Sequence, residues 1–188
     1  YYYFTICGEK IYIKEERKMR KIKDFRQFNK RLYHNNIKEK GMFEIPDNLK
    51  LNNDEYCSIL SVIYIQVEKL LRNPLHIHYT DHSIAHSIRI INIISKIIGG
   101  IDLHFNEEEK FILLSAVLLH DIGMQTPDYA DLGELPLNTE NLEKIRKKHH
   151  EYSERLIIDS IQCSEDETYF LGLNSKEELV DDIALVAK

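Results

Sequence analysis

The residues best suited to chemistry are a His-Asp pair and a separate histidine. His120 and Asp121 directly follow an apolar run, Phe111 to Leu119, interrupted only by Ser115. A buried carboxylate is costly unless it is paired or bound to a metal. Adjacent residues do not share a helix face, but at a helix end the chain turns and both side chains can reach one ion. Imidazole plus carboxylate suits the divalent metals Mn, Fe, Co, Ni and Zn.

Two ligands from one turn do not make a metal site, and His86 is the best-placed third candidate. It precedes Ile90, Ile93 and Ile97 at helical spacing, so we expect it at the inner end of a buried stripe. The alternative for His86 is a buried histidine bonded to a backbone carbonyl. The alternative for the His-Asp pair is a helix-end turn whose Asp caps the next segment.

The elements that position these residues are predicted to be helices. Long segments with helical spacing separate a few clusters of Gly, Pro and Asn, and no βαβ alternation occurs, so we predict an all-α bundle. The first predicted helix is Asp54–Leu71. The second runs from a cap at Thr80 or Asp81 to Gly99-Gly100, and the third is capped by Asn106 with Glu109 and ends at Leu119. The remaining predicted helices are Thr139–Ile161, Glu165–Leu171 and Ser175–Lys188, the last opened by a Ser175–Glu178 capping box.

Bulk composition narrows the class of protein. The 188 residues suit one domain with an added segment, and 43% apolar residues can build its core. A net charge of −6 argues against a basic footprint for nucleic acid over the whole domain. The three cysteines are far apart and form no CxxC pair, which predicts reduced thiols and a cytoplasmic location. No apolar run reaches the ~18 residues of a membrane span, so we expect no membrane partner.

We expect two regions. Residues 1–50 form an extension with an aromatic, irregular or β-like start, a basic helix or arm at Lys21–Lys38, and a connector. Residues 51–188 form the helical domain, which we expect to be truncated at its C-terminal end within a longer polypeptide. The absence of GxxxxGK[ST], GxGxxG, HExxH and GxSxG argues against the common nucleotide-loop, dinucleotide, zincin and serine-hydrolase sites.

Three segments resemble a known family. HSIRI at residues 86–90 and LLHDIG at residues 118–123 are similar to the two leading motifs of HD-domain phosphohydrolases. Residues 145–153 resemble an Arg-x-x-His-x-x-x-Ser segment of some HD subgroups. The TDHS segment at residues 80–83 resembles HD domains of larger bacterial proteins, some joined to a heat-shock-type ATPase module. The resemblance covers roughly residues 74–188.

The resemblance implies a helical domain in which His86, His120 and Asp121 bind one or two divalent ions, drawn from Mn, Fe, Co, Ni, Zn and Mg. It implies a further Asp ligand, which is Asp181, Asp182 or a residue beyond the end of the chain. The implied activity is hydrolysis of a phosphoester by a metal-activated water, on a nucleotide, a cyclic nucleotide or a nucleic acid. The alternative is an inactive HD domain that senses a ligand or binds a partner within a larger ATPase-type protein.

Two further residues are candidates for the reaction itself. His149 could ligate a second ion, contact phosphate or move a proton, and Arg146, one helical turn earlier, could steady a phosphate. For His149 and His150 the alternative is a solvated, lysine-rich helix face. We favour function for His149 and the solvated face for His150. His82, four residues before His86, is equally compatible with a role beside the ligands and with a place at the rim. We interpret the remaining histidines as structural: His76, His78 and His104.

Overall fold

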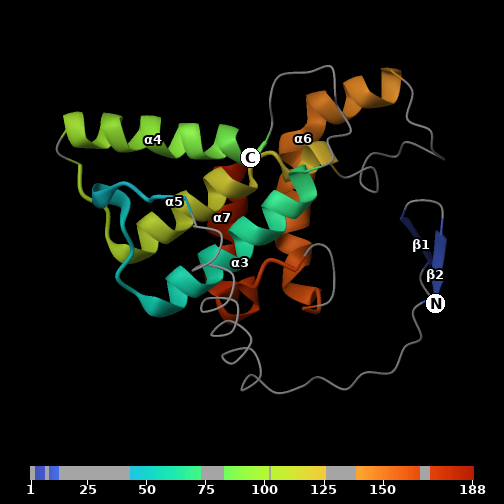
Figure 1. The fold of residues 1–188 in the computed structure, drawn as a ribbon, viewed down its shortest axis with the longest axis horizontal. Helices are drawn as coiled ribbons and strands as arrows, with labels where there is room; N and C mark the ends of the chain where they lie inside the picture. The colour runs from blue at the N-terminus through green and yellow to red at the C-terminus, as the bar shows by residue number, and fades with distance from the viewer. Residues whose placement is uncertain are drawn as a thin grey trace.

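A computed structural model describes residues 3–6, 9–12, 43–72, 83–101, 103–125, 139–165 and 170–188. Within these ranges five α-helices pack around one apolar core (Figure 1). They are α3 (Asp54–Leu71), α4 (Ile84–Gly100), α5 (Glu107–Leu119), α6 (Thr139–Asp159) and α7 (Val180–Ala187). The predicted all-α class is confirmed.

The N-terminal segment, expected to be irregular or β-like, contains two short antiparallel strands, β1 (Tyr3–Ile6) and β2 (Glu9–Tyr12). Tyr3 pairs with Tyr12, and Ile6 pairs with Glu9. The predicted basic helix at Lys21–Lys38 lies outside the described residues. The connector before α3 contains a 3-10 turn, η1 (Asp47–Leu49), whose Leu49 is buried in the core.

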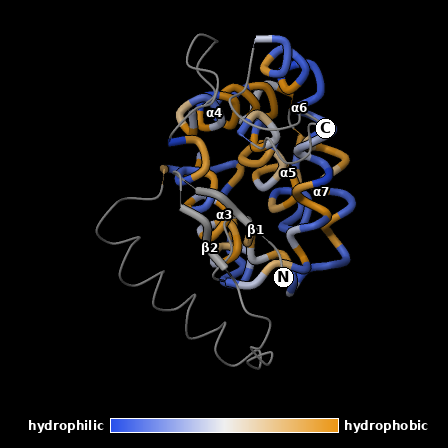
Figure 2. The backbone as a smooth tube through the Cα atoms, turned by 90° about the vertical axis from the view of Figure 1, so that its right-hand side faces the viewer, coloured by the Kyte–Doolittle hydropathy of each residue, from blue (hydrophilic) through white to orange (hydrophobic). Residues whose placement is uncertain are grey.

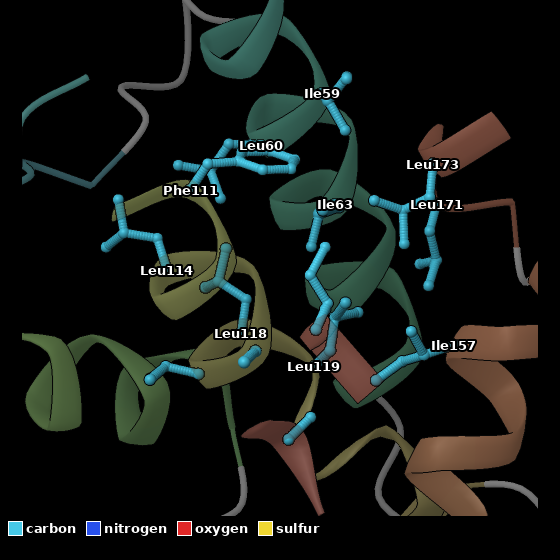
Figure 3. Packing of buried hydrophobic residues seen from close by; sticks show 14 of the residues in the cluster. Ile59, Leu60, Ile63, Phe111, Leu114, Leu118, Leu119, Ile157, Leu171 and Leu173 are labelled. Atoms are coloured by element: carbon cyan, nitrogen blue, oxygen red, sulfur yellow. The ribbon is translucent and has the colours of Figure 1, made fainter. Parts of the chain in front are cut away.

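The helix α5 is the centre of the bundle. Asn106 accepts a hydrogen bond from the Glu109 amide while the Glu109 carboxylate accepts one from the Asn106 amide, so the predicted capping box is present. The helix packs against α3, α4 and α7, and its side chains from Phe111 to Leu119 are mostly buried (Figure 3). Apolar residues all round α5 therefore reflect a helix surrounded by others.

The neighbouring α3 begins where predicted, because the Asn53 side chain accepts hydrogen bonds from the amides of Glu55 and Tyr56.

In Figure 2 hydrophilic turns of α6 contrast with hydrophobic turns of α4. In the described residues after α6 there are three short 3-10 turns: η4 (Ser160–Gln162), η5 (Leu173–Ser175) and η6 (Glu177–Leu179). No helix of the described residues is long and apolar enough to cross a membrane.

Two predictions about α4 are wrong. The helix begins at Ile84, with Ser83 and not Thr80 or Asp81 at its N-cap. The stripe through Ile93 and Ile97 is exposed, at 56% and 57%, whereas Ser87, Ile91 and Ile98 are buried. Isoleucines cover more than half of the circumference of this helix, so apolar spacing could not tell which part of that broad face meets the core.

The C-terminal helix predictions are confirmed only in part, because α7 lies inside the predicted Ser175–Lys188 helix but begins later. The described part of Glu165–Leu171 is not helical, and Phe170 and Leu171 are buried in irregular chain before the left-handed Gly172. Ser175 lies in η5, so it does not open a helix with Glu178, and α7 begins only at Val180. Burial of large apolar side chains in irregular chain here outweighs local helix-start signals.

We predict that Leu114→Ala, which empties a fully buried position on α5, lowers the free energy of unfolding by about 2–5 kcal/mol. The matched control is Leu185→Ala on α7, where the side chain is 69% exposed; it should change stability by less than about 0.5 kcal/mol. Urea unfolding measures both values. Equal effects of the two substitutions would contradict this description of the core.

Candidate metal centre

The His-Asp pair lies in a turn at the end of α5. The helix ends at Leu119, and after His120 and Asp121 the chain enters the 3-10 turn η2 (Ile122–Gln125). The amide of Met124 donates to the Asp121 carbonyl at 3.0 Å, which closes the turn. As predicted, the turn brings the adjacent side chains together, with His120 Nε2 3.0 Å from Asp121 Oδ2.

The third residue of the group comes from α4. His86 lies in the first turn of that helix, and its Nε2 is 3.8 Å from Asp121 Oδ2. The rings of His86 and His120 are 5.4 Å apart between centroids. One ligand atom from each of the three residues lies within 4.8 Å of the other two. Two separate helices thus deliver two imidazoles and one carboxylate to one point.

This donor set fits a divalent ion. Ligands lie about 2.0–2.2 Å from such an ion, so two of them are at most about 4.4 Å apart. Both separations from Asp121 Oδ2 fall within that limit. His120 Nδ1 lies 2.8 Å from the Val117 carbonyl, so an Nδ1–H donor there leaves the Nε2 lone pair for a cation. His86, His120 and Asp121 could therefore hold a metal ion.

Burial and charge act in opposite directions on the His120 imidazole. Burial disfavours its charged form and lowers the pKa. The hydrogen bond to Asp121, the negative charge of that carboxylate and the bond to the Val117 carbonyl all raise it, and the net pKa lies above the ordinary value. The metal-free centre therefore attracts positive charge.

A fourth side chain, His149 of α6, faces the same carboxylate from its other side. Its Nε2 is 3.6 Å from Asp121 Oδ1, and its Nδ1 is 2.7 Å from the Arg146 carbonyl. The neighbouring His150 has its Nε2 3.9 Å from Glu151. The two histidines therefore differ in position, because His149 is placed against Asp121 whereas His150 faces Glu151.

The Arg146 guanidinium is half-exposed and makes a two-point contact with Glu143, with Nε at 3.0 Å and Nη2 at 2.8 Å from its carboxylate oxygens. What Arg146 gives the site directly is its carbonyl, which orients His149. The predicted phosphate contact of its side chain stays a prediction.

Among the described residues, the other candidates are not part of this group. Asp181 and Asp182, considered for a further ligand, are exposed in the first turn of α7, and the group of possible ligands found among the described residues includes neither. His104 is exposed. The remaining histidines lie outside the described residues: His76, His78 and His82.

Sequence reasoning gave Ser153 no role of its own, although it was part of the third motif. Its hydroxyl donates to the His120 carbonyl at 2.6 Å and accepts the Gly123 amide at 2.9 Å. Its spacing could have indicated this place, because a residue four positions after His149 lies on the same helix face as His149.

An all-α bundle in which a His-Asp turn meets a histidine from a second helix defines an HD-like helical domain. A protein-family model described as HD-CE matches residues 76–188, more than half of the chain. The chain therefore belongs to the HD-CE family. That range includes α4 to α7 and every residue of the candidate metal centre. No curated protein and no solved structure shows a significant match to the chain.

We predict that NMR titration of the metal-free protein gives His120 a pKa above its ordinary value of about 6.5. Asp121→Asn should lower this pKa, because it removes the charge that stabilises the imidazolium while burial still disfavours it. A wild-type pKa below the ordinary value, or one that the substitution leaves unchanged, would contradict the electrostatics described here.

Proposed function

We propose that this domain is a metal-dependent hydrolase of phosphoester bonds, acting on a nucleotide, a cyclic nucleotide or a nucleic acid. The observation that carries the proposal is the meeting of His86 Nε2, His120 Nε2 and the buried Asp121 carboxylate at one point. Membership of the HD-CE family supports an HD-type domain, and hydrolysis is the step that we add.

In this proposal His86, His120 and Asp121 hold the ion through two nitrogens and one oxygen. Bound there, a divalent ion would supply Lewis-acid activation of a water and of a phosphoryl oxygen. The Val117 carbonyl fixes the orientation of the His120 ring through Nδ1. Mn, Fe, Co, Ni and Zn suit this mixed nitrogen and oxygen donor set.

We assign proton transfer to His149. Its ring is partly exposed and its Nδ1 is engaged by the Arg146 carbonyl, which leaves Nε2 directed at the centre. An imidazole in this position can accept a proton from water or give one to a leaving oxygen. Arg146 would contact a substrate phosphate only by exchanging its Glu143 partner for the phosphate oxygens.

The second candidate function is a non-catalytic module that senses a ligand or binds a partner. It is favoured by the small ligand group, which among the described residues has one carboxylate, while Asp181 and Asp182 are exposed on α7. Elemental analysis followed by a phosphodiesterase screen with Mn²⁺ separates the two. Metal without turnover on any phosphoester would favour the module.

We further propose a cytoplasmic location. Cys57 and Cys163 are free thiols in the structure, as expected of a chain kept in a reducing compartment.

For the metal site we predict that Asp121→Ala reduces both bound metal and hydrolysis by at least ~100-fold, since loss of an outer-shell partner alone typically costs 10–100-fold. Far-UV circular dichroism should stay close to wild type, because the residue lies in a turn. The matched control is Asp47→Ala, a carboxylate whose side chain is 99% exposed in η1, which should retain metal and activity. Full metal-dependent turnover by Asp121→Ala would refute the site.

For the proton-transfer role we predict that His149→Ala lowers kcat on the order of 10²–10⁴-fold while metal content stays near wild type. His150→Ala, one position along α6, is the control. It should leave kcat within about threefold, because that ring packs edge-on against His149 and faces Glu151 without being placed against Asp121. Loss of metal from His149→Ala would show that the residue is a ligand, and unchanged turnover would remove it from the mechanism.

A further inference from the structure

One hydroxyl holds both ends of the turn that carries the candidate ligands. Ser153 is fully buried on α6, where it donates to the carbonyl of His120 at 2.6 Å and accepts the amide of Gly123 at 2.9 Å. The His120 carbonyl and the Gly123 amide lie on either side of Asp121 and Ile122 in the chain. A single side chain from another helix therefore fixes the backbone on both sides of the carboxylate.

The backbone of the turn at Gly123 packs directly against α6 and leaves no room for a side chain. A Cβ at Gly123 would overlap the His149 carbonyl oxygen and would lie 2.6 Å from the Ser153 amide nitrogen and 2.9 Å from Tyr152 Cβ. The φ angle of Gly123 is not in the left-handed region, so glycine is needed here for space rather than for conformation. Any side chain at this position would push the turn away from α6.

His149 and Ser153 lie one helical turn apart on the same face of α6. The helix that Ser153 ties to the turn is thus the one that places His149 Nε2 3.6 Å from Asp121 Oδ1. A change in the spacing between α6 and the turn would alter the geometry of the His120-Asp121 pair and its separation from His149 together.

We propose that Ser153 is a positioning residue of the metal centre. With Gly123 it forms a turn clamp, defined here as these two residues and the two Ser153 hydrogen bonds, which sets the His120-Asp121 geometry and seats it beside His149. The inference rests on the proposed function, because it assigns the clamp to the same ion. The competing explanation is that Ser153 only adds packing stability to the interface between α6 and η2.

Ser160 provides a matched control for that explanation. It is also fully buried, lies in η4 directly after α6, and donates at 2.6 Å to the Ile157 carbonyl. Its bond stays within three residues of chain, whereas those of Ser153 span 30 and 33. Ser160→Ala therefore removes a comparable buried hydroxyl without touching the turn.

The experiment compares wild type, Ser153→Ala, Ser153→Cys and Ser160→Ala by Mn²⁺ titration, with free ion followed by electron paramagnetic resonance. Amide hydrogen exchange of the metal-free proteins is measured at Ile122–Gln125. Cysteine nearly keeps the volume of serine but bonds weakly, so it tests the clamp if the alanine variant fails to fold. Both Ser153 variants should bind Mn²⁺ about 10–100-fold more weakly than wild type and exchange faster at η2. Ser160→Ala should bind within about threefold of wild type, because it leaves the turn intact.

Mn²⁺ affinity in the Ser153 variants equal to that of Ser160→Ala would overturn the positioning role. If wild type itself binds no Mn²⁺, the proposed function fails, and hydrogen exchange alone then decides about the clamp. In that case, faster exchange at η2 in the Ser153 variants and not in Ser160→Ala would support the conclusion that the turn clamp holds the turn in place. Unchanged exchange would overturn it.

Discussion

The Asp121 carboxylate is buried at the C-terminal end of α5, with three imidazole nitrogens within 4 Å of its oxygens. Removing a carboxylate from water is costly unless positive charge or hydrogen bonds replace the lost hydration. Its position increases this cost, because the C-terminal end of a helix carries partial negative charge. The site therefore favours positive charge, and the pKa of His120 is accordingly raised in the metal-free chain.

The arrangement of α4, α5 and α6 places nitrogen donors around this carboxylate. The central α5 is surrounded by apolar neighbours, and this packing holds its C-terminal end in place. α4 crosses it so that the first turn presents His86, and α6 packs on η2 so that His149 meets the second oxygen. The clamp formed by Gly123 and Ser153 joins α6 to the turn through backbone contact and two buried hydrogen bonds. The same few peptide groups therefore determine both the packing of α6 on η2 and the positions of the candidate ligands.

Local chemistry made much of the site predictable from sequence. A His-Asp pair after a nearly unbroken apolar run implied a turn at a buried helix end, and Asn53 and the Asn106–Glu109 box marked two helix starts correctly. The buried face of α4 could not be predicted, because isoleucines cover more than half of the circumference of that helix. The 3-10 turns before α7 could not be predicted either, because tertiary burial of Phe170 and Leu171 decides them.

The central claim is that one cation joins residues from α4 and from the turn after α5. Anomalous diffraction from crystals grown with Mn²⁺ tests this directly, because the signal locates the ion without reference to activity. We expect a strong peak about 2.0–2.4 Å from His86 Nε2, His120 Nε2 and an Asp121 oxygen. A map with no peak among these atoms at saturating Mn²⁺, or with the ion held by other residues, would contradict the account.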